Sequence, residues 1–295
     1  MRLSRCLPYG SVPADRRIPA DRRIPAVLSI AGSDSGGGAG IQADLKAFAR
    51  CGVHGMTAIT ALTAQSTVGV SAVHTVPPGF IEQQVAVVAG DIGVDAVKTG
   101  MLGTAETVAA VARAYDRLPA GTPLVVDPVM VAESGSMLLD DAACAAVVEL
   151  LLPRATVVTP NLIEARVLAG PDVDPEDPEG LARALHALGP EAVVVTGGHR
   201  DEIVDTFFDG REVTRIPGTR HPDGAAHGSG CTHASALAAH LALGFTPLEA
   251  ARAAREVAAD AVRDGLREIG RGPGPVDALG IAGRERPRPR GIIAR

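Results

Sequence analysis

Short runs of apolar, β-branched residues alternate with helix-like stretches along most of the chain, and this alternation restricts the fold most strongly. The runs are continuously apolar, which is typical of strands covered by helices on both faces. Strands that alternate with helices form a mostly parallel sheet. We therefore predict an α/β fold with three layers. The predicted strands cover 27–31, 56–62, 96–99, 124–127, 156–159 and 192–196, and the predicted helices cover 40–50, 79–89, 104–117, 140–151, 180–188, 231–243 and 247–265.

The composition fits a chain that folds around a large aliphatic core. Hydrophobic residues make up 46% of the 295 residues and aromatic residues only 2%, so Val, Leu, Ile and Ala must fill that core. Residues 204–208 and 212–216 flank Asp209 and Gly210, and this spacing predicts a β-hairpin. We expect one domain over 26–280.

Charge, cysteine spacing and hydropathy argue against several function classes. The formal net charge of −6 argues against nucleic-acid and anionic-membrane partners. The four cysteines form no C-x-x-C pair, and no apolar stretch approaches the roughly 18 residues of a membrane span. We therefore expect a cytoplasmic protein with no nucleic-acid or membrane partner.

The two ends of the chain differ in composition from its centre. The hexamer ADRRIP occurs twice in tandem, at 14–19 and 20–25, without the apolar segment of a secretory signal. Residues 283–295 are rich in Arg and Pro. We expect a disordered extension over 1–25 and a loose tail over 281–295.

Nearly every unusual residue follows a predicted strand. Because ligands collect at the carboxyl ends of the strands in open α/β sheets, this convergence predicts a binding site at that edge. The residues concerned are Gly32, Gln65, Lys98, Asp127, Asn161 and Gly197.

Three small residues, Gly228, Ser229 and Gly230, precede Cys231 at the start of a predicted helix. Their backbone can turn successive N–H groups in one direction, and the helix N-terminus adds its positive dipole end. The segment can form an anion hole for a phosphoryl group, or it can be an ordinary glycine-rich loop with a helix cap. We expect a lowered pKa for a thiol at this position.

The glycine-rich stretch 31–48 matches neither common nucleotide-binding loop. No Lys follows the glycines as a P-loop requires, and Ile41 stands where the Rossmann pattern needs glycine. In the following helix, Asp44 lies on the apolar side with Phe48. A carboxylate there needs a partner, which can be a ligand or a structural cation.

Other polar positions permit both a functional and a structural interpretation. Gln65 offers a donor and an acceptor to the edge of a heterocycle, or it is an exposed loop residue. Asp127 ends an apolar strand, where a carboxylate can hold Mg²⁺ directly or through water. Asn161 and Glu164 can form a capping box, serve a nucleotide or metal, or do both.

Eight motifs in order resemble the hydroxymethylpyrimidine/phosphomethylpyrimidine kinases of thiamine synthesis, within the ribokinase-like superfamily. The resemblance covers about 26–279 and implies a three-layer ribokinase-like fold. It implies an enzyme that uses MgATP to phosphorylate 4-amino-5-hydroxymethyl-2-methylpyrimidine, and then phosphorylates the product to the pyrophosphate. The motifs are IAGSDSGGGAGIQADLKAF, ITALTAQST, VKTGMLG, DPVMVAESG, TPNLIEA, TGGH, HGSGCTH and GPGPVDAL.

The resemblance also assigns roles to individual positions. Cys231 faces the substrate hydroxyl, where related sugar kinases carry an aspartate, and Gly228, Ser229 and Gly230 form the anion hole. Glycines 36–38 are candidates for a flap that excludes water. The implied pyrimidine pocket consists of Gly32, Asp44, Gln65, Met101 and Val129, the nucleotide site of Asn161, Thr196 and Gly198, and the metal site of Asp127 and Glu164.

Thr196 and Glu133 depart from the family pattern, because many relatives carry Lys at these positions. The loss of a phosphate-neutralising Lys weakens the expected ATP contacts. Lys98 and Arg220 are the candidates to compensate for it.

Two other functions fit the same motifs. Superfamily relatives accept pyridoxal or pyridoxine, so a vitamin B6 kinase is the alternative enzyme. The alternative outside the enzymes is a catalytically weak sensor that binds a thiamine precursor. Relatives form homodimers, and the resemblance implies a homodimer here.

Overall fold

The computed structural model describes residues 23–130, 139–198 and 203–285, which form one sheet of nine strands. Neighbouring strands are parallel from β2 through β1 and β4 to β7, whereas β3, β8 and β9 pair antiparallel. In sheet order the strands are β3 (Gly69–Thr75), β2 (His54–Ser66), β1 (Ala26–Asp34), β4 (Ala96–Thr99), β5 (Leu124–Val126), β6 (Val157–Val158), β7 (Ala192–Val195), β8 (Val204–Phe208) and β9 (Val213–Pro217).

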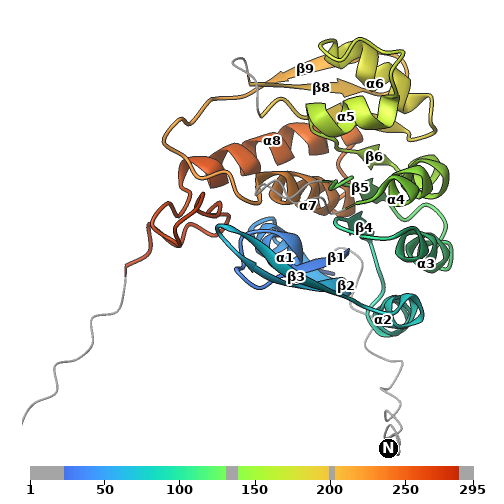
Figure 1. The fold of residues 1–295 in the computed structure, drawn as a ribbon, viewed down its shortest axis with the longest axis horizontal. Coiled ribbons are helices and arrows are strands. Elements are labelled where there is room, and N and C mark those ends of the chain that lie inside the picture. Colours follow the sequence, from blue (N-terminus) through green and yellow to red (C-terminus); the bar gives the residue numbers. More distant parts are fainter. Residues whose placement is uncertain (1–22, 131–138, 199–202, 286–295) are drawn as a thin grey trace, which may run out of the picture.

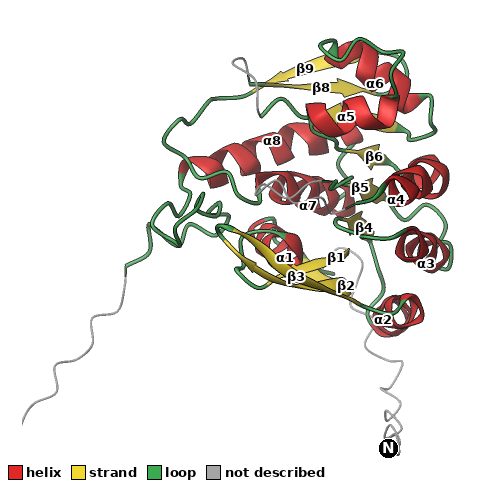
Figure 2. Cartoon of the chain, viewed as in Figure 1, coloured by secondary structure: helices red, strands yellow, loops and turns green. Residues whose placement is uncertain are grey.

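Helices cover both faces of this sheet, which confirms the predicted three-layer α/β fold (Figures 1 and 2). One face carries α1 (Gly40–Arg50), α7 (Ser229–Ala242) and α8 (Pro247–Arg263). The opposite face carries α2 (Pro78–Asp91), α3 (Ala105–Tyr115), α4 (Asp141–Ala146), α5 (Leu162–Ala169) and α6 (Pro178–His186). No helix of the described residues combines the length and the apolar character needed to cross a membrane.

Alternating side chains of the strands supply the two halves of an aliphatic core. Along β1, Val27 packs toward α1 and α7, whereas Leu28 and Ile30 pack toward the other helix layer. On α7 the small residues 234, 236, 238 and 239, all Ala, are fully buried. They let this helix lie directly against the sheet, which brings its N-terminus close to the strand ends.

The predicted hairpin is confirmed as β8 and β9, which pair antiparallel from Val204 with Pro217 to Phe208 with Val213. The predicted helix over 140–151 consists of α4 and a π-helical stretch, Val147–Leu151, which a short 3₁₀ turn, Leu152–Arg154, follows. The sequence analysis did not predict β3. Its residues are exposed or half-buried, so it carries no buried face and no apolar periodicity that would mark it as a strand.

The chain connections diverge between the neighbouring strands β1 and β4. The chain leaves β1 for α1 on one face, whereas it enters β4 from α2 on the other face. In open α/β sheets, ligands bind where the connections diverge in this way, beyond the carboxyl ends of the strands. The described geometry therefore favours the ends of β1 and β4 as the place of a site.

The predictions for the ends of the chain lie mostly outside the described residues. These predictions concern the extension over 1–25, of which the structure describes only 23–25, and the tail over 281–295, of which it describes only 281–285. Glu133 also lies outside the described residues.

Candidate active site

A fully buried lysine joins two carboxylates beneath the carboxyl edge of the sheet. Lys98 Nζ on β4 lies 2.9 Å from Asp44 Oδ1 on α1 and 3.3 Å from Asp127 Oδ2 at the end of β5. The side chains of Lys98 and Asp44 have no exposed surface. Burial alone would lower the pKa of Lys98, but attraction by Asp44, Cys231 and Asp127 raises it above its usual value. We call Asp44, Lys98 and Asp127 the charge row.

Two hydroxyls complete the surroundings of Asp44. Ser29 on β1 donates to Oδ2 at 2.6 Å, and Ser235 on α7 donates to Oδ1 at 2.8 Å. The sequence predicted a partner for the Asp44 carboxylate. That partner is a structural cation, Lys98, together with these hydroxyls. The carboxylate ties β1, β4, α1 and α7 together, and this leaves its contact with a pyrimidine as a proposal.

Lys98 was a candidate to replace the missing phosphate-binding lysine, but both carboxylates of the charge row pair with it. Lys98 is buried between two carboxylates, so it does not face open space as a free positive charge. This position argues against the predicted compensation by Lys98. Arg220, the other candidate, is exposed.

Cys231 lies in the first turn of α7 and meets the charge row there. Its thiol interacts with Asp127, and the backbone N–H of Gly40 also faces it. Burial, with Asp127 and Asp44, outweighs the attraction of Lys98 and raises the pKa of Cys231 to about 12. The predicted lowering of this pKa is therefore wrong, because desolvation and two carboxylates outweigh the helix N-terminus.

The turn before Cys231 packs against the glycine-rich loop after β1. Gly228 caps α7 in a left-handed conformation, with φ 85°. A side chain on Gly228 would begin 1.9 Å from the carbonyl oxygen of Gly38, so only glycine permits this contact. The predicted flap, 36–38, and the predicted anion hole are thus in direct backbone contact.

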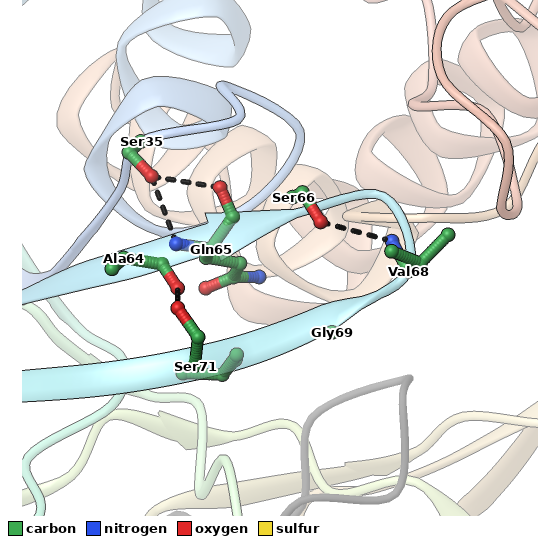
Figure 3. A pocket seen from close by; sticks show the side chains of 8 residues that line it. Ser35, Ala64, Gln65, Ser66, Val68, Gly69 and Ser71 are labelled. Atoms are coloured by element: carbon green, nitrogen blue, oxygen red, sulfur yellow. Dashed lines mark hydrogen bonds between the residues drawn. The ribbon is translucent and has the colours of Figure 1, made fainter.

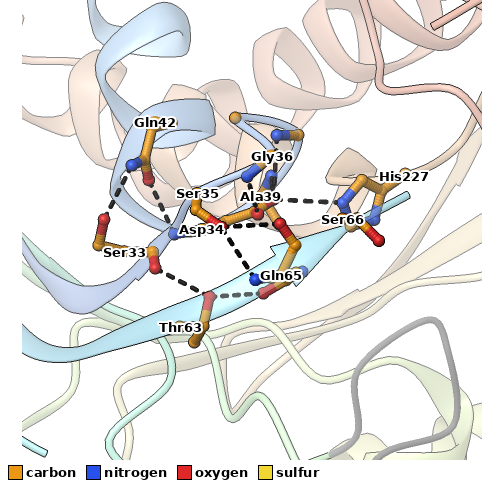
Figure 4. A network of polar contacts seen from close by, with 12 residues as sticks. Ser33, Asp34, Ser35, Gly36, Ala39, Gln42, Thr63, Gln65, Ser66 and His227 are labelled. Carbon is orange, nitrogen blue, oxygen red and sulfur yellow. Dashed lines mark hydrogen bonds and ion pairs between the residues drawn. The ribbon is translucent and has the colours of Figure 1, made fainter. Parts of the chain in front are cut away.

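Asp34 fixes the conformation of this flap (Figure 4). Its carboxylate accepts the backbone N–H groups of Gly36, Gly38 and Ala39 at 2.7, 3.0 and 2.8 Å, and His227 Nε2 lies 3.4 Å away. Burial would raise the pKa of Asp34, but the contacts with His227 and these N–H groups hold it below its usual value. Sequence reasoning missed Asp34 and His227, although an Asp directly before several glycines is a recognisable signal for such a loop.

A second group of predicted residues lies at the ends of β6 and β7. Asn161 and Glu164 form the predicted capping box of α5, with both hydrogen bonds at 2.9 Å. Asn161 bridges to Thr196 in a parallel β-bridge. Burial, followed by repulsion from Asp127, raises the pKa of Glu164 to about 8. This repulsion links the Asn161–Thr196 group to the charge row.

The remaining predicted pocket residues lie around β1, β2 and β4. Gly32 occupies an irregularity in the β1–β2 register, and a side chain there would begin 2.6 Å from the Met101 methyl carbon. Gln65 lines an open hollow of about 500 Å³ on the β2–β3 hairpin, together with Ser35 (Figure 3). Val129 is half-buried just after Asp127.

The charge row predicts a large stability effect. Lys98→Met leaves two buried carboxylates without their cation, and such a break costs about 3–5 kcal/mol. Urea unfolding should detect a loss of this size. The control Arg113→Met breaks an exposed ion pair with Glu82 and should cost less than about 1 kcal/mol. Equal losses in the two variants would contradict the structural role of Lys98.

Comparisons with known proteins agree with this arrangement. The model of the phosphomethylpyrimidine kinase family matches residues 34–277. The hydroxymethylpyrimidine/phosphomethylpyrimidine kinase of Rhizobium meliloti is 49% identical over 256 residues, which cover 84% of this chain and 95% of that protein.

Two solved structures share the fold. Pyridoxal kinase from Staphylococcus aureus, in complex with AMP-PCP and pyridoxal, has a TM-score of 0.79 at 36% identity and covers 88% of this chain and 95% of its own. Phosphomethylpyrimidine kinase from Clostridium difficile has a TM-score of 0.69 at 36% identity and covers 79% of this chain and 97% of its own. Because the family model matches most of the length of this chain, the chain belongs to the phosphomethylpyrimidine kinase family.

Proposed function

We propose that this protein is a two-step kinase of thiamine synthesis. It transfers the γ-phosphoryl group of ATP to the hydroxyl of 4-amino-5-hydroxymethyl-2-methylpyrimidine, and then a second phosphoryl group to the phosphate of the product. The observation that carries the proposal is the meeting of Cys231, the Gly228 turn and the charge row at the carboxyl edge of the sheet. Family membership supports the reaction class.

Both steps form a P–O bond to the acceptor oxygen and break the bond between the γ-phosphorus and the β-phosphate oxygen. In the first step the acceptor is an alcohol, which releases its proton. In the second step it is a phosphate oxygen that is already deprotonated. Phosphoryl transfer depends mostly on positioning and on stabilisation of charge, which fits the N–H groups of residues 228–230 at the start of α7.

The charge row supports a pyrimidine pocket at the ends of β1, β2 and β4. Gly32 and Met101 approach each other there, and the Gln65 amide offers its donor and acceptor to the edge of a heterocycle. Asp44 stabilises this region from beneath through Lys98. Asp44 and Val129 belong to the same proposed pocket.

The proposed metal is Mg²⁺, and the residues proposed to hold it are Asp127 and Glu164. Among the described residues, the buried Asp127 Oδ2 has no hydrogen-bond partner beyond its ion-pair contact with Lys98 Nζ at 3.3 Å, and the repulsion between Asp127 and Glu164 is the kind that a further cation relieves. In the described part of the chain, no group of three or more His, Cys, Asp or Glu side chains could hold a metal ion. Mg²⁺ neutralises phosphate charge and is typically held by one or two carboxylates together with phosphates and water, so the nucleotide would supply the remaining oxygens. Asn161, Thr196 and Gly198 would then lie beside the nucleotide.

Loss of one proposed ligand should weaken the binding of the metal. Asp127→Asn removes the charge that attracts the cation, so the half-saturating Mg²⁺ concentration in a kinase assay should rise roughly tenfold. The exposed Asp116→Asn should leave that concentration unchanged. An unchanged value for Asp127→Asn would argue against Asp127 as a ligand.

A neutral thiol at position 231 suits both acceptors, because a fixed negative charge there would repel a phosphate monoester. In Cys231→Asp, kcat/KM should therefore fall roughly tenfold further for the second step than for the first. Cys231→Ser keeps a small neutral group and should affect the two steps alike. Equal losses for the two acceptors in Cys231→Asp would sink this explanation.

One structural comparison favours a second candidate function, a pyridoxal kinase. The enzyme from Staphylococcus aureus has the higher TM-score of the two neighbours, 0.79 against 0.69. The family match and the identity to the Rhizobium meliloti enzyme favour the pyrimidine.

Mass spectrometry of the products decides between these functions. The protein is incubated with MgATP and hydroxymethylpyrimidine, with pyridoxal in a parallel reaction. Both the monophosphate and the pyrophosphate of the pyrimidine are expected. Pyridoxal phosphate alone would move the protein to vitamin B6 salvage, and no product from either acceptor would favour a sensor.

We further propose that the domain over 26–280 forms a homodimer in the cytoplasm. β3 is an edge strand, and Leu62, Val68 and Val73 on the β2–β3 hairpin are about half exposed, at 47%, 56% and 50%. An open apolar edge of this kind is suited to pairing with a second copy. Light scattering should give twice the chain mass of 30.1 kDa, and a mass of one chain would contradict the dimer.

A further inference from the structure

Three buried titratable side chains meet on the α7 side of the sheet, and the proposed reaction does not use them. Asp205 comes from β8, His233 from α7 and Arg255 from α8. His233 Nε2 lies 3.6 Å from Asp205 Oδ2, and Arg255 Nη1 lies 3.7 Å from Asp205 Oδ1. The Asp205 side chain has no exposed surface. A buried carboxylate is costly to desolvate, so its position calls for an explanation.

The closest contact of Asp205 is with the loop that follows β7. The backbone N–H of Gly197 donates to Asp205 Oδ1 at 2.9 Å, and this hydrogen bond is buried. A side chain on Gly197 would begin 2.0 Å from the carbonyl oxygen of Val204, so the loop lies directly against β8. Asp205 therefore fixes the residue that stands between Thr196 and Gly198.

The other side of the carboxylate faces the helix that carries Cys231. His233 lies two residues after Cys231 on α7 and is 3% exposed. Three atoms have no hydrogen-bond partner among the described residues: both ring nitrogens of His233, and Asp205 Oδ2. His233 thus holds the carboxylate by a polar contact of 3.6 Å from Nε2 to Oδ2, and not by a hydrogen bond.

Within the described residues, Asp205 forms ion pairs only with His233 and Arg255. The Arg255 guanidinium lies over Gly218 after β9, where a side chain would begin 2.0 Å from Nη2. The glycine leaves room for this approach. The carboxylate therefore contacts α7 and α8, and the end of β9 packs against the guanidinium of Arg255.

We propose that Asp205 is a positioning residue for nucleotide binding: it anchors the Gly197 N–H, while His233 and Arg255 hold its carboxylate in place. The Gly197 segment after β7 and α7, through His233, then share one buried anchor, and the nucleotide loop keeps its place relative to Cys231. This inference rests on the proposed function, which assigns the nucleotide to Thr196 and Gly198.

Calorimetry with MgADP tests the anchor, because it needs no phosphoryl acceptor and stays informative if the pyrimidine assignment fails. Asp205→Ala should raise the Kd roughly tenfold, since Gly197 loses its acceptor. Asp205→Asn keeps an oxygen for that N–H and should stay within about threefold of the unmodified protein. Thr206→Val, a buried neighbour whose side chain points to the other face of β8, should leave the Kd unchanged.

His233→Leu separates positioning from stability. It removes two buried nitrogens that lack partners, so the melting temperature should be equal or higher. The Kd for MgADP should nevertheless rise about threefold, because the carboxylate gains freedom to move away from Gly197. A purely structural role predicts no such rise.

Steady-state kinetics provide the second readout. In Asp205→Ala the KM for ATP should rise with the Kd, whereas the KM for the pyrimidine should stay within about twofold. Equal rises in both KM values, or an unchanged MgADP affinity in Asp205→Ala and His233→Leu, would overturn the proposal. If Asp205→Ala does not fold, His233→Leu decides alone: weaker MgADP binding at an undiminished melting temperature supports the anchor, and unchanged binding overturns it.

Discussion

The buried ammonium of Lys98 is the constraint on which the rest of the site depends. It lies between Asp44 on α1 and Asp127 at the end of β5, and Asp44 in turn accepts from β1 and α7. Five elements, β1, β4, β5, α1 and α7, therefore have to meet at one point before these charges are compensated. A buried ion pair adds little to stability but is costly to break, so it favours one arrangement of these elements over others.

Glycines allow the loops above this charge row to approach each other by their backbones. The contact of Gly228 with Gly38 brings the start of α7 against the loop that Asp34 organises, and Gly197 lies in the same way against β8. Side chains at these positions would force the backbones apart. The flap, which packs against the proposed anion hole, and the proposed nucleotide loop are thus each held by a carboxylate that accepts backbone N–H hydrogen bonds, Asp34 for the flap and Asp205 for the nucleotide loop.

Sequence reasoning predicted what depends on local pattern. The parallel strands were recognisable as continuous apolar runs, and the position of Asp44 on the apolar side of α1 predicted a buried partner. The identity of that partner was not predictable, because Lys98 is 54 residues away and its place follows from the pairing of β1 with β4. The predicted lowering of the Cys231 pKa was wrong for the same reason. The helix N-terminus is recognisable in the sequence, whereas the burial and the two carboxylates come from distant segments. The strand β3 carries no buried face, so no pattern marked it.

A crystal structure with AMP-PCP, Mg²⁺ and hydroxymethylpyrimidine tests the central claim most directly, namely that the charge row sets the geometry of phosphoryl transfer. The account predicts that Lys98 keeps its contacts with Asp44 and Asp127 and that the hydroxymethyl oxygen lies beside Cys231. It also predicts that the γ-phosphate lies on the N–H groups of residues 228–230. A pyrimidine bound elsewhere on the sheet edge, or a Lys98 that leaves both carboxylates to reach the phosphates, would contradict the account.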